Sequence, residues 1–261
     1  MEISIVILNY KMKGLVKNCL RAILESDLPE PYEIIVVDNN SRDGIEQMME
    51  EEFPQVKFIQ SDKNAGMGAG NNLGIKAASG KYVLILNPDI FVYPESIRKL
   101  HEHIRERADI GLLAPKLVNA DRSLQLTCYR WHGLLTPIYR RTLFGRLPSG
   151  QKDLARFLMM EWDHEQTQEV DWIQGSCIVI PKRVLDEVGL FDEQFFMYFE
   201  DTDLCRRINK AGYKNVYFPE TEVIHMHRRQ SADGGFFNVL FNKMTRVHLI
   251  SWWKYLRKWS E

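Results

Sequence analysis

A carboxylate and a carboxamide stand together at the end of one short apolar run. Residues 82–86 are apolar and rich in β-branched side chains, and Asn87-Pro88-Asp89 follows them directly. Such a run predicts a buried strand, and oxygen ligands just past its end suit a divalent cation. The alternative is that Asp89 caps the helix expected near Pro94.

A second group of acids, Glu200, Asp201 and Asp203, follows the aromatic run 195–199. A carboxylate that emerges from apolar surroundings tends to have a raised pKa, which suits a general base. The alternative is structural, because acidic side chains favour the first turn of any helix.

Two histidines, His225 and His227, flank Met226 after a short β-like run. Alternation along an extended segment places both on one face, where at least one could reach a cation held by Asp89. A lone histidine with a purely structural role is the competing interpretation.

Two further stretches suit a nucleotide. Asp38 ends a predicted strand, where it could accept a hydrogen bond from a base or a ribose, although a turn would use the same residue. The glycine-rich stretch 64–74 could bring backbone N–H groups to a phosphate. Its glycines match neither the dinucleotide fingerprint nor a P-loop, so tight packing of a helix on a sheet is the alternative.

The elements that position these residues alternate between strand and helix in the first 107 residues. This alternation predicts an α/β fold with a parallel sheet and helices on both faces. The expected strands are 3–8, 33–37, 56–60 and 82–87. The expected helices are 14–26, 43–52, one that the stretch 64–74 leads into and that ends near Ser79, and 94–107.

The pattern changes from residue 110 onward. Residues 110–118 and 124–128 are β-like, 129–168 show no period, and 171–180 are strand-like. A long irregular connection is usually functional, and we expect it to influence the choice of acceptor. A short helix at 181–188, a helix from Glu200 to Gly212 and strands at 215–218 and 223–225 complete this half.

Composition narrows the function and the compartment. The net charge of −1 predicts no nucleic-acid partner. The four cysteines form no CxxC pair, which argues against a zinc site or a disulfide framework and predicts a reducing cytoplasm. We see no signal peptide at the N-terminus and no apolar run of membrane-spanning length.

Six motifs in order make the chain resemble family 2 glycosyltransferases with the GT-A fold, and most of all their bacterial rhamnosyltransferase branch. The resemblance covers about residues 3–230. The motifs are Asn9-Tyr10, Asp38-Asn39-Asn40-Ser41, Asn64-x-Gly66 with Asn72-x-Gly74, Asn87-Pro88-Asp89, Trp172 to Ser176, and Glu200-Asp201-x-Asp203-Leu204-x-x-Arg207.

The resemblance implies a role for each matching residue. Asp201 is the catalytic base, and Asp89 with His225 holds Mg²⁺ or Mn²⁺, although Asn87 replaces the first Asp of the family's DxD motif. The acceptor side is formed by Trp172, Gly175 and Glu200. The implied donor-binding residues are Asn9, Asp38, Asn40, Asn64, Gly66, Asn72 and Asn87.

The implied reaction is an inverting single displacement. The favoured donor is dTDP-L-rhamnose and the favoured acceptor a lipid-linked glycan of a cell-surface polysaccharide. A UDP-hexose donor is the alternative within the same reaction type. A non-catalytic protein that binds nucleotide sugars is the alternative from another class.

Three parts are expected: a nucleotide-sugar half at 1–118, an acceptor-binding and catalytic half at 119–233, and a basic amphipathic tail at 234–261. Aromatic residues of the tail, Trp252, Tyr255 and Trp259, oppose basic ones, which favours a helix on the inner face of an anionic membrane. The alternative is that the apolar face, which Phe236, Leu240, Met244 and Val247 begin, packs on the domain or on a second subunit of a homodimer.

Overall fold

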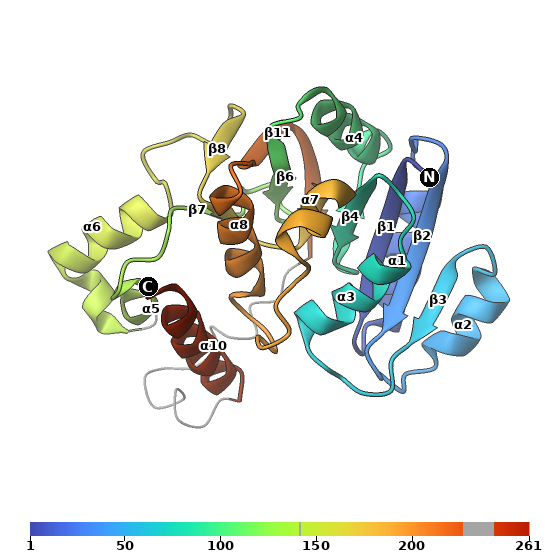
Figure 1. Cartoon of the computed structure of the whole chain (residues 1–261), viewed down its shortest axis with the longest axis horizontal. Helices are drawn as coiled ribbons and strands as arrows, with labels where there is room; N and C mark the ends of the chain where they lie inside the picture. The colour runs from blue at the N-terminus through green and yellow to red at the C-terminus, as the bar shows by residue number, and fades with distance from the viewer. Residues whose placement is uncertain (141, 227–242, 261) are drawn as a thin grey trace.

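The computed structural model describes residues 1–140, 142–226 and 243–260. A large sheet forms the centre, with helices on both of its faces (Figure 1). Its strands follow the order β3-β2-β1-β4-β10-β6-β11-β5, and β8 pairs with β11 beside this path.

The first half confirms the expected alternation. Strands β1 to β4 pair in parallel, because each is followed by a helix that returns the chain to the same end of the sheet. The strands are β1 (Ile3–Asn9), β2 (Tyr32–Asp38), β3 (Lys57–Gln60) and β4 (Tyr82–Leu86). The helices are α1 (Lys13–Leu24), α2 (Ile45–Glu52), α3 (Met67–Ala77) and α4 (Ser96–Glu106).

The second half extends the same sheet. Strands β6 (Ile110–Val118) and β11 (Lys214–His225) run in the direction of β1, so the sheet is mostly parallel. The opposite direction is taken by β10 (Cys177–Pro181), β5 (Ile90–Val92) and β8 (Gln168–Val170).

Two apolar layers enclose this sheet. Side chains at alternate positions of each strand point to opposite faces, so Ile5 and Ile7 join one layer and Val6 the other. Helices α1, α2 and α4 cover the first face. Helices α3, α7 (Lys182–Val188) and α8 (Glu200–Lys210) cover the second.

Several expectations for the second half were wrong. Of residues 124–128, Cys128 alone lies in a strand, and the two strands expected at 215–218 and 223–225 are one strand, β11. The run 171–180 is not one strand, because it breaks at 174–176 and its first part, β9 (Trp172–Ile173), pairs with β7 (Cys128–Tyr129) in a separate small sheet. The stretch 129–168 is not irregular throughout. It holds α5 (Thr136–Tyr139), the 3₁₀ helix η1 (Leu143–Arg146) and α6 (Pro148–Phe157). Helix α6 buries two of its residues, Gly150 and Phe157.

The C-terminal helix α10 (Lys243–Trp259) packs against the domain through its aromatic face. Tyr255 is buried with Phe195 and Phe199, and Trp252 and Trp259 pack beside them. Of the alternatives for this face, the structure therefore supports packing on the domain. Within the described ranges, no helix is long and apolar enough to cross a membrane. His227, Phe236 and Leu240 lie outside the described residues.

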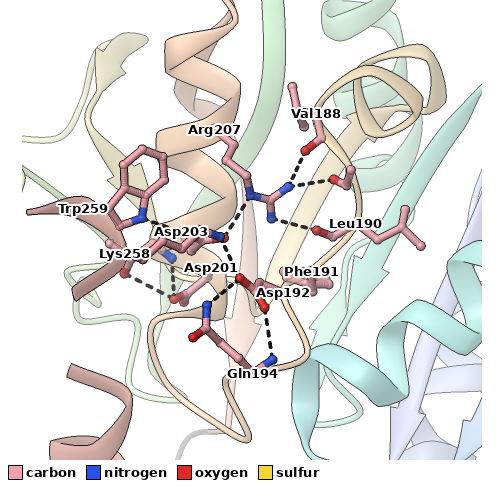
Figure 2. A network of polar contacts seen from close by, with 12 residues as sticks. Val188, Leu190, Phe191, Asp192, Gln194, Asp201, Asp203, Arg207, Lys258 and Trp259 are labelled. Carbon is pink, nitrogen blue, oxygen red and sulfur yellow. Dashed lines mark hydrogen bonds and ion pairs between the residues drawn. The ribbon is translucent and has the colours of Figure 1, made fainter. Parts of the chain in front are cut away.

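A polar network joins the end of α10 to the start of α8 (Figure 2). Its centre is Asp203, whose carboxylate is fully buried. It accepts hydrogen bonds from Arg207 Nε (2.9 Å) and Trp259 Nε1 (2.9 Å) and pairs with Lys258 Nζ (2.8 Å). Arg207 also donates to the carbonyl oxygens of residues 188, 189 and 190, so the network fixes the loop before α8 as well.

Replacing Lys258 should therefore destabilise the protein. Lys258→Met leaves the buried Asp203 carboxylate with one cation fewer and also removes the 2.7 Å ion pair to Asp192. We expect the free energy of unfolding to fall by about 1–3 kcal/mol in urea titrations. The matched variant Lys99→Met breaks only the exposed pair with Glu95 and should cost less than about 1 kcal/mol. Equal losses would contradict a special role for the network.

Candidate active site

The predicted site residues come from the carboxyl ends of parallel strands. Asp38 ends β2, Asn87 follows β4, and His225 ends β11, so all three lie at one edge of the sheet. Strand β1 lies between β2 and β4, which makes it the point where the strand order reverses. Open α/β sheets bind their ligands at such a switch point.

Asp38 is buried and organises the ends of β1 and β2. One carboxylate oxygen accepts from Asn9 Nδ2 (2.7 Å), and the other accepts from Ser41 N and Gln60 Nε2, both at 2.9 Å. Asn9 is fully buried, and its amide also bonds Ser41 Oγ (2.9 Å) and Met12 N (3.0 Å). Asn9 therefore holds the Asp38 carboxylate through a buried hydrogen bond, whereas the resemblance implied that Asn9 binds the sugar-nucleotide donor.

Gly66 brings the glycine-rich loop against the segment before α8. Its φ is +97°, and a Cβ there would lie 2.2 Å from the carbonyl oxygen of Phe196. Asn64 Oδ1 accepts from Gly66 N (3.0 Å) and from Asn39 Nδ2 (3.1 Å), and Asn39 also donates to Gly66 O (2.9 Å). Asn40 is half-buried, and its Nδ2 donates to Asp62 O (2.9 Å). Asn39 and Asn40, which directly follow β2, therefore hold the glycine-rich loop in place.

Asn72 holds the loop at residues 191–193 onto α3. Its side chain is 1% exposed, donates to Phe191 O (2.9 Å) and Glu193 Oε1 (3.0 Å), and accepts from Phe191 N (3.0 Å). A Cβ at Gly74 would lie 2.3 Å from Val6 Cγ1. Tight packing of helix on sheet, the alternative from the sequence, therefore explains this half of the glycine-rich stretch, and Asn72 contacts no open space.

Asp201 is connected to the Asn-Pro-Asp motif through the turn at 174–176. Its Oδ2 accepts from Gly175 N (3.1 Å) and its Oδ1 from Thr202 N (2.7 Å). The carbonyl oxygen of the residue after Gly175, Ser176, accepts from Asn87 N (2.8 Å). Two backbone bonds thus place the carboxylate on α8 beside the end of β4.

The pKa values of the neighbouring carboxyl groups of Glu200 and Asp201 are both raised by burial, but to different degrees. Burial raises the pKa of Asp201, while hydrogen bonds from Gly175 and Thr202 hold it down. Burial, and then the charge of Asp201, raises the pKa of Glu200 well above its usual value, and Glu200 Oε2 has no hydrogen-bond partner. Burial therefore favours the protonated form of both groups, and more strongly that of Glu200.

Asp89 and His225 face each other, with His225 Nε2 lying 3.5 Å from Asp89 Oδ2. Gln125 fixes the imidazole, because its Nε2 donates to His225 O (2.8 Å) and Asn119 Oδ1 (2.6 Å), which leaves its Oε1 to accept from His225 Nδ1 (2.8 Å). In the neutral ring Nε2 then points a lone pair toward the carboxylate. Two acceptors this close suit a shared cation, so the pair fits Mg²⁺ or Mn²⁺.

Within residues 1–140, 142–226 and 243–260, further acids and histidines do not complete a coordination shell around this pair. Among the residues that the structure describes, no group of three or more His, Cys, Asp or Glu side chains could hold a metal. Asn87 is the remaining oxygen donor of the motif. A cavity of about 460 Å³ opens beside His225, lined also by Asn119, Asp121 and Met226. It offers room for a ligand that brings its own oxygens.

Trp172 does not lie on an open acceptor face. It is 7% exposed, stacks on Tyr129 with ring centroids 4.3 Å apart, and donates from Nε1 to Arg130 O (3.2 Å). The predicted contact of Trp172 with the acceptor stays a prediction. Of the residues expected on this side, Gly175 donates a hydrogen bond to Asp201, and Glu200 directly precedes it in the chain.

Together these groups support one kind of chemistry. A half-buried carboxylate that can accept a proton is linked through residues 175 and 176 to the Asn-Pro-Asp motif, which carries one member of a carboxylate–imidazole pair suited to a cation and to the charge of a diphosphate. The sequence had indicated Asp201, Asp89 and His225. It carried no signal for Gln125, whose partner lies 100 residues away in the chain.

Known glycosyltransferases are similar in sequence to this chain. The family model described as "Glycosyl transferase family 2" matches residues 4–160. The N-acetylglucosaminyl-diphospho-decaprenol L-rhamnosyltransferase of Mycobacterium tuberculosis is 28% identical over 88% of this chain and 80% of its own. The rhamnosyltransferase WbbL of Escherichia coli is 24% identical over 98% of this chain and 93% of its own.

Among solved structures, GalNAc-T7 with UDP, GalNAc and Mn²⁺ is similar with a TM-score of 0.65 at 15% identity. The match covers 88% of this chain and 44% of GalNAc-T7, so the chain spans less than half of that protein. At this identity the likeness concerns the fold, which is GT-A.

Proposed function

Because the chain belongs to glycosyl transferase family 2, we propose that it transfers L-rhamnose from dTDP-L-rhamnose to a lipid-linked glycan, with inversion at the anomeric carbon. That it is a glycosyltransferase enzyme follows from the family. The donor and the acceptor rest on one observation, which is that relatives matching 88% and 98% of the chain are both named rhamnosyltransferases.

In this proposal Asp201 accepts the proton of the acceptor hydroxyl as that oxygen attacks the anomeric carbon. The N–H of Gly175 holds the carboxylate in place, and its burial favours proton uptake. Asp89 and His225, with Asn87, would hold Mg²⁺ or Mn²⁺, which when bound supplies positive charge for the leaving diphosphate. The buried Asp38 shapes the nucleotide side of the pocket.

The pH dependence of transfer should report on Asp201. Burial raises its pKa above 3.8, the ordinary value for Asp. The base is therefore lost as the pH falls through the raised value, and kcat/KM should drop about tenfold per pH unit below it. Glu200→Gln mimics the protonated form of Glu200 and should leave the fall of kcat/KM at acidic pH where it is. If this fall moved to another pH in the variant, Glu200 would titrate in the same range as Asp201.

A thermal-shift panel tests the donor. dTDP, UDP and GDP and their sugars are each measured with Mn²⁺, Mg²⁺ or EDTA. A ligand at a hundred times its dissociation constant adds about 2.7 kcal/mol, a shift that is easily seen. Metal-dependent stabilisation by dTDP species supports the proposal. Stabilisation by UDP species alone would replace the donor with a UDP-hexose, the alternative that UDP in GalNAc-T7 favours.

A further inference from the structure

Helices α5, η1 and α6 form a small lobe, residues 134–157, at the end of the molecule opposite α2 and β3 (Figure 1). Its parts are bonded to one another. Thr136 Oγ1 on α5 donates to Asp153 Oδ2 on α6 (2.6 Å), and Thr142 Oγ1 donates to Ile138 O (2.9 Å). The lobe is therefore an ordered support for the side chains on its outside.

Those outer side chains are large and apolar. Leu134 is 72% exposed, Leu143 69%, Phe144 58% and Leu147 50%, and Leu135 is also exposed. Single exposed leucines are ordinary, but five large apolar residues within 14 positions of one lobe are not. Such a surface indicates contact with an apolar partner.

The charge of the same segment is strongly one-sided. Residues 130–156 contain six basic residues and one acid, Asp153, whereas the whole chain has 34 basic and 35 acidic residues. Asp153 accepts hydrogen bonds from Thr136 and Arg156. Arg140, Arg146 and Lys152 are exposed among the apolar side chains. The partner should therefore be both apolar and negatively charged.

We propose that this lobe seats the enzyme on an anionic lipid membrane. Leucines insert among lipid chains, whereas a nucleic acid would call for stacking aromatic groups. Basic side chains beside them bind acidic head groups. The inference extends the proposed function, since a lipid-linked acceptor is presented at such a surface. It moves the membrane contact from the aromatic face of α10, which is packed on the domain, to residues 134–147.

Vesicle flotation of the full chain tests the proposal. Two preparations are compared, phosphatidylglycerol with phosphatidylcholine and phosphatidylcholine alone. Leu143→Ser with Phe144→Ser should lower the partition coefficient on the anionic vesicles about tenfold or more, because both side chains are exposed and would be buried in lipid. Arg140→Gln with Arg146→Gln should lower it on anionic vesicles alone.

The matched control changes the outer face of α10, where Ile250 is 54% and Trp253 58% exposed. Ile250→Ser with Trp253→Ser should keep most of the binding. Loss of binding in this control but not in the lobe variant would overturn the proposal, as would failure of the full chain to float. Sedimentation showing a dimer that the lobe variant dissociates would assign the surface to a second copy instead. The dTDP thermal shift of each variant reports on the donor site separately, so failure here and failure of the proposed donor are distinguishable.

Discussion

Asp201→Asn is expected to lower kcat for glycosyl transfer by about 10²–10⁴-fold while leaving donor binding nearly unchanged. The amide keeps the size of the side chain, and its oxygen can still accept from Gly175 N, the 3.1 Å bond that positions the carboxylate. It cannot take the proton of an attacking hydroxyl. The measurement is kcat with saturating donor, combined with the nucleotide-induced thermal shift.

The control is Asp186→Asn on α7, an exposed carboxylate that pairs only with Lys182 on the same helix. It should change neither quantity. If Asp201→Asn lost donor binding together with turnover, the side chain would have a donor-binding role, and the base would have to be sought elsewhere.

Asp89→Ala is expected to abolish the metal-dependent part of donor binding. The change removes the carboxylate that faces His225 Nε2 at 3.5 Å, and with it the one charged oxygen ligand of the Asn-Pro-Asp motif. Stabilisation by dTDP should then be the same in Mn²⁺ and in EDTA. An unchanged metal dependence would remove Asp89 from the metal site.

Gln125→Leu provides a graded comparison at the same site. It leaves both metal-binding side chains in place but frees the His225 ring, so metal affinity should fall by about 10–100-fold rather than vanish. Asn119→Ala removes the acceptor of Gln125 Nε2 and the side-chain bonds to Ser123 but leaves Gln125 and His225 in place, so it should have a smaller effect. Equal losses in all three variants would indicate general damage to the fold.

The fold could be predicted where local pattern and burial agree. Four short apolar strands, each followed by a helix, defined the parallel half before any contact was known. The lobe at 134–157 was not predicted: α5 and η1 have only four residues each, and α6 buries only two of its ten. The break in the run 171–180 was not predicted, because the apolar content of the run does not show that the chain turns at Gly175, whose N–H bonds Asp201.

For the site, residue type and position after a strand were enough to indicate Asp89 and Asp201. Motif likeness also assigned Asn9, Asn72 and Trp172 to ligands, whereas the structure buries their side chains and uses their polar groups inside the protein. Supporting residues such as Gln125 and Lys258 could not be found, because their role depends on partners distant in sequence.

The most direct test of the account is a transfer reaction with dTDP-L-rhamnose, Mn²⁺ or Mg²⁺, and a prenyl diphosphate-linked N-acetylglucosamine acceptor, the kind of substrate named for the Mycobacterium tuberculosis relative. Mass spectrometry and NMR of the glycolipid are the readouts. We expect one added rhamnosyl residue with the anomeric configuration opposite to that of the donor. Retention of configuration, or transfer from UDP-hexoses and not from dTDP-L-rhamnose, would contradict it.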